Sequence, residues 1–206
     1  MQELLSSISG WSNWIQALSL VSGIVYMVMQ IFQHKWMWYF GLVTAGAALV
    51  VALTNVGEGG VWAPLWAQVL LNGYFFIMDF VGIVSWKKIA LKSNGQLHIV
   101  RLPRKHVLLY GIALFLGVPA LCVLFSLTND PSPVVEGLSF GLSILAQIFL
   151  TKSHLEQWYL WIVADIVAII IYATQGAWFM VGLYWCYTAN AFVGIWYWRN
   201  HGKYVE

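Results

Sequence analysis

Two stretches of this chain decide its fold: FVGIVSWK at residues 80–87 and FVGIWYWR at residues 192–199. The second repeats the first 112 positions later, with the same FVGI, the same Trp and a basic residue behind it. Another pair, WYFGLV at 38–43 and WYLWIV at 158–163, lies 120 positions apart. The repeated order predicts a chain built from two similar halves. Three smaller matches agree with it: Trp66 with Trp178, His34 with His154, and QIF at 30–32 with QIF at 147–149.

The composition places both halves in a membrane. Hydrophobic residues make up 61% of the 206 residues and charged ones 9%, whereas an ordinary globular chain carries about a quarter charged residues. Eight acidic and ten basic residues could not cover the surface of a soluble protein of this size. Cys122 and Cys186 lie in apolar runs, so neither a disulfide framework nor a metal site is predicted. The first residues, MQELLSSISGW, lack the basic n-region of a signal peptide, so we expect no cleavage.

Seven segments are apolar enough to cross a bilayer, for which a helix needs roughly 20 residues. Turn-forming residues separate several of them, as in NVGEGG at 55–60, TNDPSP at 128–133 and TQG at 174–176. We therefore predict an all-α integral membrane protein. Its seven transmembrane helices are expected near 14–32, 36–54, 62–86, 106–127, 133–151, 157–174 and 177–198.

The basic residues support this count and give an orientation. With seven spans, all ten Lys and Arg residues fall on one side of the membrane and the opposite loops carry none. Under the positive-inside rule that side is cytoplasmic. In a bacterial inner membrane we therefore expect the N-terminus on the outer side and the C-terminus on the cytoplasmic side. These ten residues are Lys35, Lys87, Lys88, Lys92, Arg101, Arg104, Lys105, Lys152, Arg199 and Lys203.

The repeat predicts how the spans are arranged. Spans one to three match spans five to seven, and span four connects them, so the two three-helix repeats run parallel. We expect an N-terminal bundle at 1–92, a connector at 93–132 and a C-terminal bundle at 133–206. This SWEET-like 3+1+3 plan is typical of small transporters that hold a substrate near the midplane, between two halves that rock for alternating access.

Span six carries the strongest candidate for a binding site. Trp158, Trp161 and Asp165 follow i, i+3, i+7 spacing and share one helical face. An acid near mid-membrane costs about 2.5–3.5 kcal/mol on insertion scales, so Asp165 is expected to face protein or water. Its carboxylate would suit a polar or cationic ligand, with Trp rings to stack on a planar group. The alternatives are a structural acid and, for Trp158, a place in the interfacial aromatic belt.

Two further spans offer polar and aromatic groups at membrane depth. Asn72 and its neighbours form a stripe on span three, although Asn and Gln side chains also hold transmembrane helices together. Asp79, nearer the cytoplasmic end, fits a structural role or an inner gate, and Thr188 on span seven is placed with it. Core packing is the alternative for the remaining residues. The candidate binding residues on these two spans are Gln68, Asn72, Phe75, Tyr184, Trp185, Tyr187 and Asn190.

No enzyme signature accompanies these groups. The chain contains no HExxH, P-loop or Rossmann fingerprint, so neither catalysis nor ATP-driven transport within this chain is predicted. We expect no cofactor, no metal and no nucleic acid, because membrane topology alone accounts for the basic loop at 87–105.

Several motifs together resemble the PnuC family of vitamin transporters. WYLWIVADIVAIIIY at 158–172 is similar to the family's W-x-x-W-x-x-x-(N/D) signature, and NGYFFIMDFVGIVSW at 72–86 is similar to its third helix. The run at 133–147 also fits, so the resemblance covers nearly the whole chain. One departure is Gly41, which stands in the first half where span six has the second Trp. We therefore do not transfer the roles of span six to span two.

The resemblance implies a function. Family members import nicotinamide riboside, thiamine or riboflavin by facilitated diffusion, and a cytoplasmic kinase traps the vitamin by phosphorylation. We expect a uniporter for nicotinamide riboside, an NAD precursor, with a thiamine or riboflavin carrier as the alternative. Trp158, Trp161 and Asp165 would bind it, with Asn72, Phe75, Asp79, Tyr184 and Tyr187 as neighbours. The aromatic outer faces are compatible with a homo-oligomer such as a trimer.

Two readings outside vitamin transport stay open. Sugar transport on the SWEET plan is the weaker carrier hypothesis, since the Trp and Asp residues favour an aromatic ligand. A membrane sensor without flux is the alternative from another class. It would need an output domain, but only eight residues follow Trp198.

Overall fold

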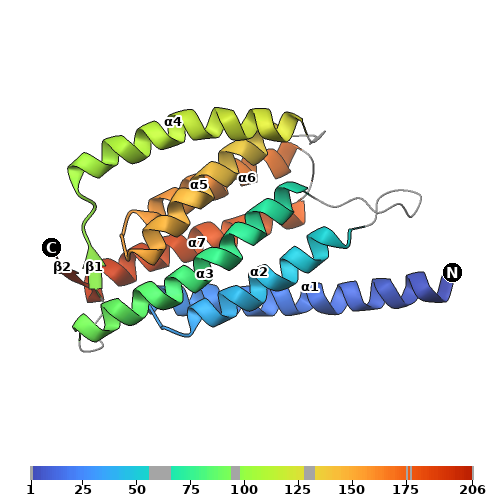
Figure 1. The fold of residues 1–206 in the computed structure, drawn as a ribbon, viewed down its shortest axis with the longest axis horizontal. Coiled ribbons are helices and arrows are strands. Elements are labelled where there is room, and N and C mark those ends of the chain that lie inside the picture. The colour runs from blue at the N-terminus through green and yellow to red at the C-terminus, as the bar shows by residue number, and fades with distance from the viewer. Residues whose placement is uncertain are drawn as a thin grey trace. The chain divides into compact units, whose positions relative to one another are not determined.

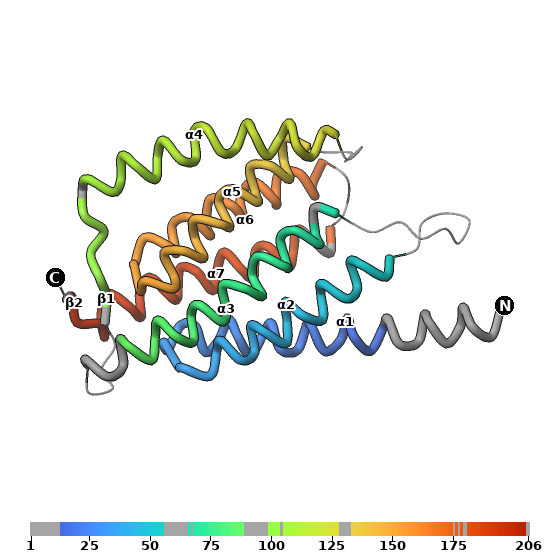
Figure 2. Tube along the Cα trace, viewed as in Figure 1, coloured from blue at the N-terminus to red at the C-terminus, as the bar shows by residue number. Residues whose placement is uncertain are grey.

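The computed structural model describes residues 2–55, 66–93, 98–127, 133–174, 176 and 178–205. Within them the chain forms seven helices and two short strands, which Figure 1 shows as a ribbon and Figure 2 as a tube along the Cα trace. In chain order these elements are α1 (Gln2–Ile31), α2 (Met37–Leu53), α3 (Trp66–Ser93), β1 (His98–Val100), α4 (Arg104–Ser126), α5 (Pro133–Thr151), α6 (Gln157–Thr174), α7 (Trp178–His201) and β2 (Lys203–Val205).

The predicted all-helical membrane architecture is confirmed at this level. Five helices are long and apolar enough to cross a membrane: α1, α3, α4, α5 and α6. The apolar α2 has 17 residues, and α7 has 24 residues but many Trp and Tyr side chains, which lower its hydropathy. The predicted start of span three at 62–65 and most of the turns at 55–60 and 128–133 lie outside the described residues, whereas in the predicted turn at 174–176 only residue 175 does.

The chain divides into two compact units, which we describe separately. Unit 1 comprises residues 1–30 and 34–83 and therefore α1, α2 and most of α3. Small residues hold α2 and α3 together: the indole of Trp38 lies on Gly82, and Asp79 lies against Gly41. On the other side of α2, Thr44 donates a hydrogen bond to the Ser22 hydroxyl of α1 at 2.9 Å.

Unit 2 comprises residues 31–33 and 84–206, with α5 at its centre. Figure 1 shows α5 beside both α4 and α6, and α6 in turn packs on α7. Gly137 and Gly141 of α5 allow α4 to approach, because a Cβ at either position would overlap Cys122 or Val118. Many apolar side chains of α4 are exposed, among them Phe115 at 79%, as expected of a lipid-facing helix.

Two tryptophans at the end of the FVGIxxW repeats bind helix termini in unit 2. The indole N–H of Trp86 donates to the Leu150 carbonyl oxygen at 3.2 Å, near the last residue of α5. The indole N–H of Trp198 donates to the Ile31 carbonyl oxygen at 3.0 Å, at the last residue of α1. Each bond satisfies a carbonyl that the helix itself leaves without a partner. Both Trp side chains are buried.

The two strands, which the sequence did not predict, form what we call the strand clasp: β1, β2 and the turn at 152–154. β1 and β2 pair in parallel, with Ile99 opposite Tyr204. The turn joins them because the Val100 N–H donates to the Ser153 carbonyl oxygen at 3.1 Å. Nδ1 of His154 lies 2.8 Å from the Val100 carbonyl oxygen. Burial lowers the pKa of His154, since it disfavours the imidazolium ion.

Candidate substrate-binding site

The α6 tryptophan that begins the predicted signature is a core residue of unit 2. Trp158 is 1% exposed and its ring lies on Gly194 of α7. It also packs edge-on against Trp198, with ring centroids 5.7 Å apart and an angle of 87°. Its indole Nε1 is buried and has no hydrogen-bond partner among the described residues. Trp158 therefore combines a structural position with an indole donor that another group could use.

Asp165 lies two turns along α6, and its side chain is 5% exposed. The carboxyl interacts electrostatically with Tyr184 and Tyr187 of α7. Burial of an acid in a membrane helix is costly unless protein or water faces it, and both tyrosines with which Asp165 interacts belong to the adjacent helix. The structure thus brings three of the predicted site residues together on the α6–α7 face.

Aromatic rings extend this cluster toward the end of α6. Tyr184 stacks on Tyr172, with ring centroids 5.4 Å apart and an angle of 21°. The same ring meets Tyr187 edge-on at 5.5 Å and 73°. The sequence interpretation missed Tyr172, although a signal was present: it follows Asp165 by seven residues and therefore shares its helical face.

Other residues predicted on α6 and α7 take different environments. Trp161 is half-buried, as is Asn190. Thr188 is 3% exposed, and its hydroxyl has no hydrogen-bond partner among the described residues. Trp185 does not join the cluster, because it is 59% exposed on the surface of α7.

The predicted residues of α3 lie in unit 1. The Asn72 side-chain amide donates to the Gln68 carbonyl oxygen at 2.8 Å, one turn earlier in the same helix. Gln68, Asn72 and Phe75 are half-buried, so part of each side chain is accessible. Asp79 is 2% exposed and fills the space left by Gly41. A close fit of this kind accounts for glycine at position 41, where the other half of the chain has Trp161.

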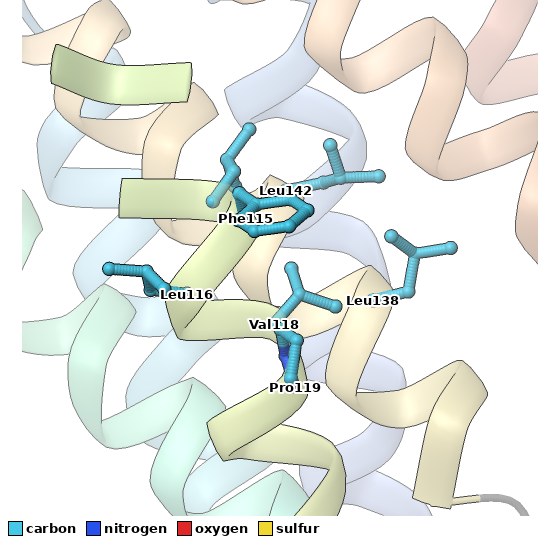
Figure 3. A pocket seen from close by; sticks show the side chains of 7 residues that line it. Phe115, Leu116, Val118, Pro119, Leu138 and Leu142 are labelled. Atoms are coloured by element: carbon cyan, nitrogen blue, oxygen red, sulfur yellow. The ribbon is translucent and has the colours of Figure 1, made fainter. Parts of the chain in front are cut away.

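Two other features bear on ligand binding. No group of three metal-binding side chains occurs in the part of the chain that the structure describes. A groove between α4 and α5, shown in Figure 3, is lined by apolar residues alone and offers a cation no polar partner. Its lining residues are Leu114, Phe115, Leu116, Val118, Pro119, Leu138 and Leu142.

Comparison with known proteins gives a consistent picture. The family model described as "Nicotinamide mononucleotide transporter" matches residues 13–200. The nicotinamide riboside transporter PnuC of Escherichia coli K12 is 22% identical, with 93% of this chain and 87% of that protein covered. The nicotinamide riboside transporter PnuC of Neisseria mucosa is 26% identical, with 91% of this chain and 73% of that protein covered.

A solved structure supports the fold. The crystal structure of the vitamin B3 transporter PnuC matches with a TM-score of 0.68 and 22% identity, covering 96% of this chain and 85% of that one. The resemblance drawn from the sequence motifs is confirmed by these matches. The chain is a multi-pass membrane protein that belongs to the nicotinamide mononucleotide transporter family, together with the PnuC proteins.

Proposed function

We propose that the protein imports nicotinamide riboside by facilitated diffusion, as a uniporter. The observation that carries the proposal is the buried carboxyl of Asp165 beside Tyr184 and Tyr187, within a family whose similar members are named for this substrate. Nicotinamide riboside carries a positive charge on a flat aromatic ring. A carboxylate with aromatic rings around it attracts such a ring by both charge and cation–π interaction.

In this proposal each part of the substrate has a partner. Asp165 attracts the charged ring, and Trp161, Tyr184 and Tyr187 provide aromatic faces. Trp158 offers its buried indole N–H. Polar groups would hydrogen-bond the ribose hydroxyls and the amide, for which the candidates are Asn190 on α7 and Gln68 and Asn72 on α3. Phe75 completes the set as an apolar neighbour.

The mechanism we propose is alternating access between two parallel three-helix bundles, residues 1–92 and 133–206, with 93–132 as connector. Matched local geometry supports such a repeat. Trp38 lies on Gly82 just as Trp158 lies on Gly194. The turns also correspond: residues 33 and 153 both have positive φ, at 47° and 56°. In each, the next amide donates back to the carbonyl five residues earlier, at 3.0 Å and 2.9 Å.

Orientation and driving force complete the proposal. The ten basic residues favour a cytoplasmic C-terminus in the bacterial inner membrane. Because the chain has no ATP-binding motif, we infer that accumulation depends on a cytoplasmic kinase that phosphorylates the imported vitamin. Assembly as a homo-oligomer such as a trimer stays a prediction, which cross-linking in native membranes would test.

The experiment is a calorimetric titration of the purified protein in detergent with nicotinamide riboside, thiamine and riboflavin. We expect saturable binding of the riboside, lost in Asp165→Ala and weakened in Trp161→Phe. Trp185→Phe is the matched control on the exposed side of α7 and should bind as the wild type does. Unchanged binding and uptake in Asp165→Ala would contradict the proposed site. If the protein bound only thiamine or only riboflavin, the proposal of a vitamin carrier would stand and its substrate would change.

Uptake measurements address the coupling separately. In proteoliposomes without a kinase, with an ion gradient imposed and the membrane potential held at zero because the riboside is a cation, a uniporter equilibrates the riboside across the membrane and does not concentrate it. An ionophore should therefore leave the final internal level unchanged. A level that rises above the external concentration and falls when the ionophore is added would contradict facilitated diffusion.

A further inference from the structure

Two buried tryptophans of unit 2 each bind the end of a helix that is distant in the sequence. The indole N–H of Trp86, on α3, donates to the Leu150 carbonyl oxygen of α5 at 3.2 Å. The indole N–H of Trp198, on α7, donates to the Ile31 carbonyl oxygen of α1 at 3.0 Å. All four residues belong to unit 2. We call the two hydrogen bonds together the tryptophan latch.

The latch is reciprocal with respect to the repeated sequence. Trp86 and Trp198 occupy the same position in the two FVGIxxW motifs. Trp86 belongs to the first motif and binds a helix of the second half of the chain. Trp198 belongs to the second motif and binds a helix of the first half. Each bond therefore connects residues that the proposed mechanism assigns to different three-helix bundles.

The residue before each tryptophan contacts the same helix end. The Ser85 hydroxyl donates to the Thr151 carbonyl oxygen at 2.8 Å, one residue beyond the carbonyl that Trp86 binds. The Tyr197 ring meets the Phe32 ring edge-on, with centroids 5.0 Å apart and an angle of 81°. Phe32 likewise lies one residue beyond the carbonyl at the other site. The two sites thus share a pattern of two successive contacts.

Interfacial anchoring is the simpler explanation for a tryptophan near a helix end. An anchor places its ring among lipid headgroups, which suits Trp36 and Trp196 at 51% and 61% exposure. Trp86 is 7% exposed and Trp198 0% exposed, and their N–H groups donate to protein carbonyls. The latch rings are therefore held inside the protein.

The latch lies at the end of the helices that carries the basic residues. Lys87 directly follows Trp86, Arg199 directly follows Trp198, and Lys152 follows the last residue of α5. The positive-inside rule assigns this end to the cytoplasm. For a substrate to leave on that side, the two bundles would have to separate where the latch connects them.

One half of the latch adjoins the candidate binding site. The Trp198 ring packs edge-on against Trp158, with centroids 5.7 Å apart. A movement of Trp158 on substrate binding would therefore reach the ring that donates to Ile31. The site and the latch are connected through this ring contact.

We propose that the tryptophan latch closes the cytoplasmic side of the transporter and that its two hydrogen bonds break when substrate is released there. The proposal rests on the alternating-access function proposed above and adds the residues that hold one of its states closed. Trp86 and Trp198 act as positioning residues, without contact to substrate. A buried hydrogen bond suits this role, because separating donor and acceptor without water leaves both unsatisfied and so disfavours partly open geometries.

The two acceptors differ in their other partners. The Leu150 carbonyl oxygen also accepts the Ser153 N–H at 3.0 Å. Among the described residues, the Ile31 carbonyl oxygen beyond the end of its helix has the indole alone. Removing the Trp198 donor should therefore favour opening more than removing the Trp86 donor.

Double electron–electron resonance tests the latch by measuring how far its two sides separate. Spin labels are attached at Lys35→Cys and Asn200→Cys, two exposed positions in different halves of the chain. The full chain also carries Cys122→Ser and Cys186→Ser and is reconstituted in lipid nanodiscs. We expect one main distance for the closed state and a longer one for the open state.

The latch variants should increase the open-to-closed ratio. We expect an increase of about 5- to 10-fold for Trp198→Phe and about 2- to 5-fold for Trp86→Phe, the size of effect that one lost hydrogen bond produces. The double variant should give about the product of the two, because the bonds share no partner. Ser85→Ala removes only a hydroxyl and serves if a tryptophan variant does not fold; it should change the ratio in the same direction.

Trp66→Phe and Trp196→Phe are the matched controls, since each removes an indole N–H from an exposed ring on the same two helices. Both should keep the wild-type distances. Unchanged ratios in the latch variants, in a protein that binds the riboside, would refute the latch and leave the proposed function standing. Raised ratios in a protein that does not bind the riboside would support the latch and refute the proposed substrate. A lowered melting temperature with unchanged distances would assign both tryptophans to stability alone and overturn the proposal.

Discussion

The indole ring of Trp158 lies so close to Gly194 that a methyl group on residue 194 would overlap it. This contact joins the first turn of α6 to α7 and fixes the ring beside Trp198. In unit 1, Trp38 and Gly82 make the corresponding contact between α2 and α3. In both places the glycine of FVGI leaves space for the ring of the tryptophan in the first turn of the preceding helix.

Replacing this glycine should therefore damage both packing and binding. We expect Gly194→Ala to destabilise the protein by about 1–3 kcal/mol, the usual cost of overpacking a core, and to weaken riboside binding by moving Trp158. Gly182→Ala is the control on the same helix, because a Cβ there meets nothing within 4 Å. Thermal unfolding in detergent, followed by calorimetric titration, measures both effects. Equal melting temperatures for the two variants would contradict the contact.

Trp198→Phe tests the hydrogen bond to the Ile31 carbonyl oxygen. The change keeps an aromatic ring but leaves a buried carbonyl without its donor, which costs about 1–3 kcal/mol. Trp196→Phe is the control, since Trp196 is two residues away and 61% exposed. We expect a lowered unfolding midpoint for the first variant and a wild-type midpoint for the second. The hydrogen bond would be unimportant if both variants unfolded at the same temperature.

Thr188→Val separates a structural role from a binding role. The Thr188 hydroxyl is buried without a hydrogen-bond partner among the described residues, so removing it should not lower the free energy of unfolding. A substrate that uses this hydroxyl would lose about 1 kcal/mol of binding energy, or roughly a fivefold change in Kd. Calorimetry and thermal unfolding of the same sample measure the two quantities. A less stable variant with unchanged Kd would assign Thr188 to the structure alone.

The strand clasp should make stability depend on pH. Because burial lowers the pKa of His154 in the folded state, the unfolded chain binds the proton more readily. The contribution of neutral His154 to the free energy of unfolding is present above the pKa of the unfolded chain, about 6.5. It is lost as the pH falls toward the pKa of the folded state. We expect the unfolding temperature to decrease from pH 7 to pH 5, with a smaller decrease in His154→Asn. Identical pH profiles for the two proteins would exclude this histidine as the source.

The helical architecture could be predicted because its signals are local and strong. Apolar segments of membrane length and turn residues between them gave helices close to the observed ones, as in α5 and α6. The buried state of Asp165 followed from the cost of an acid at membrane depth. Trp185 illustrates the limit, because the sequence placed it among the aromatic residues at mid-depth. Neighbouring residues of a helix point in different directions, so Tyr184 lies in the cluster whereas Trp185 is 59% exposed.

Long-range relationships could not be predicted in the same way. Nothing in residues 98–100 alone indicates that they form a strand, because the partner residues are 203–205. The stacking of Tyr184 on Tyr172 depends on which faces of α6 and α7 meet, and the contact between Trp158 and Gly194 is one of those that join these helices. The Trp198 bond to Ile31 similarly joins residues 167 positions apart.

The pairing of β1 with β2 also sets an order for biogenesis. β1 leaves the ribosome about 100 residues before its partner, and at 5–20 residues per second that interval is about 5–20 s. Throughout it α4, α5, α6 and α7 are being synthesised, while Ile99, fully buried in the finished protein, has no strand beside it. The clasp can close only after the seventh helix has been delivered, so its formation marks a chain whose membrane insertion is complete.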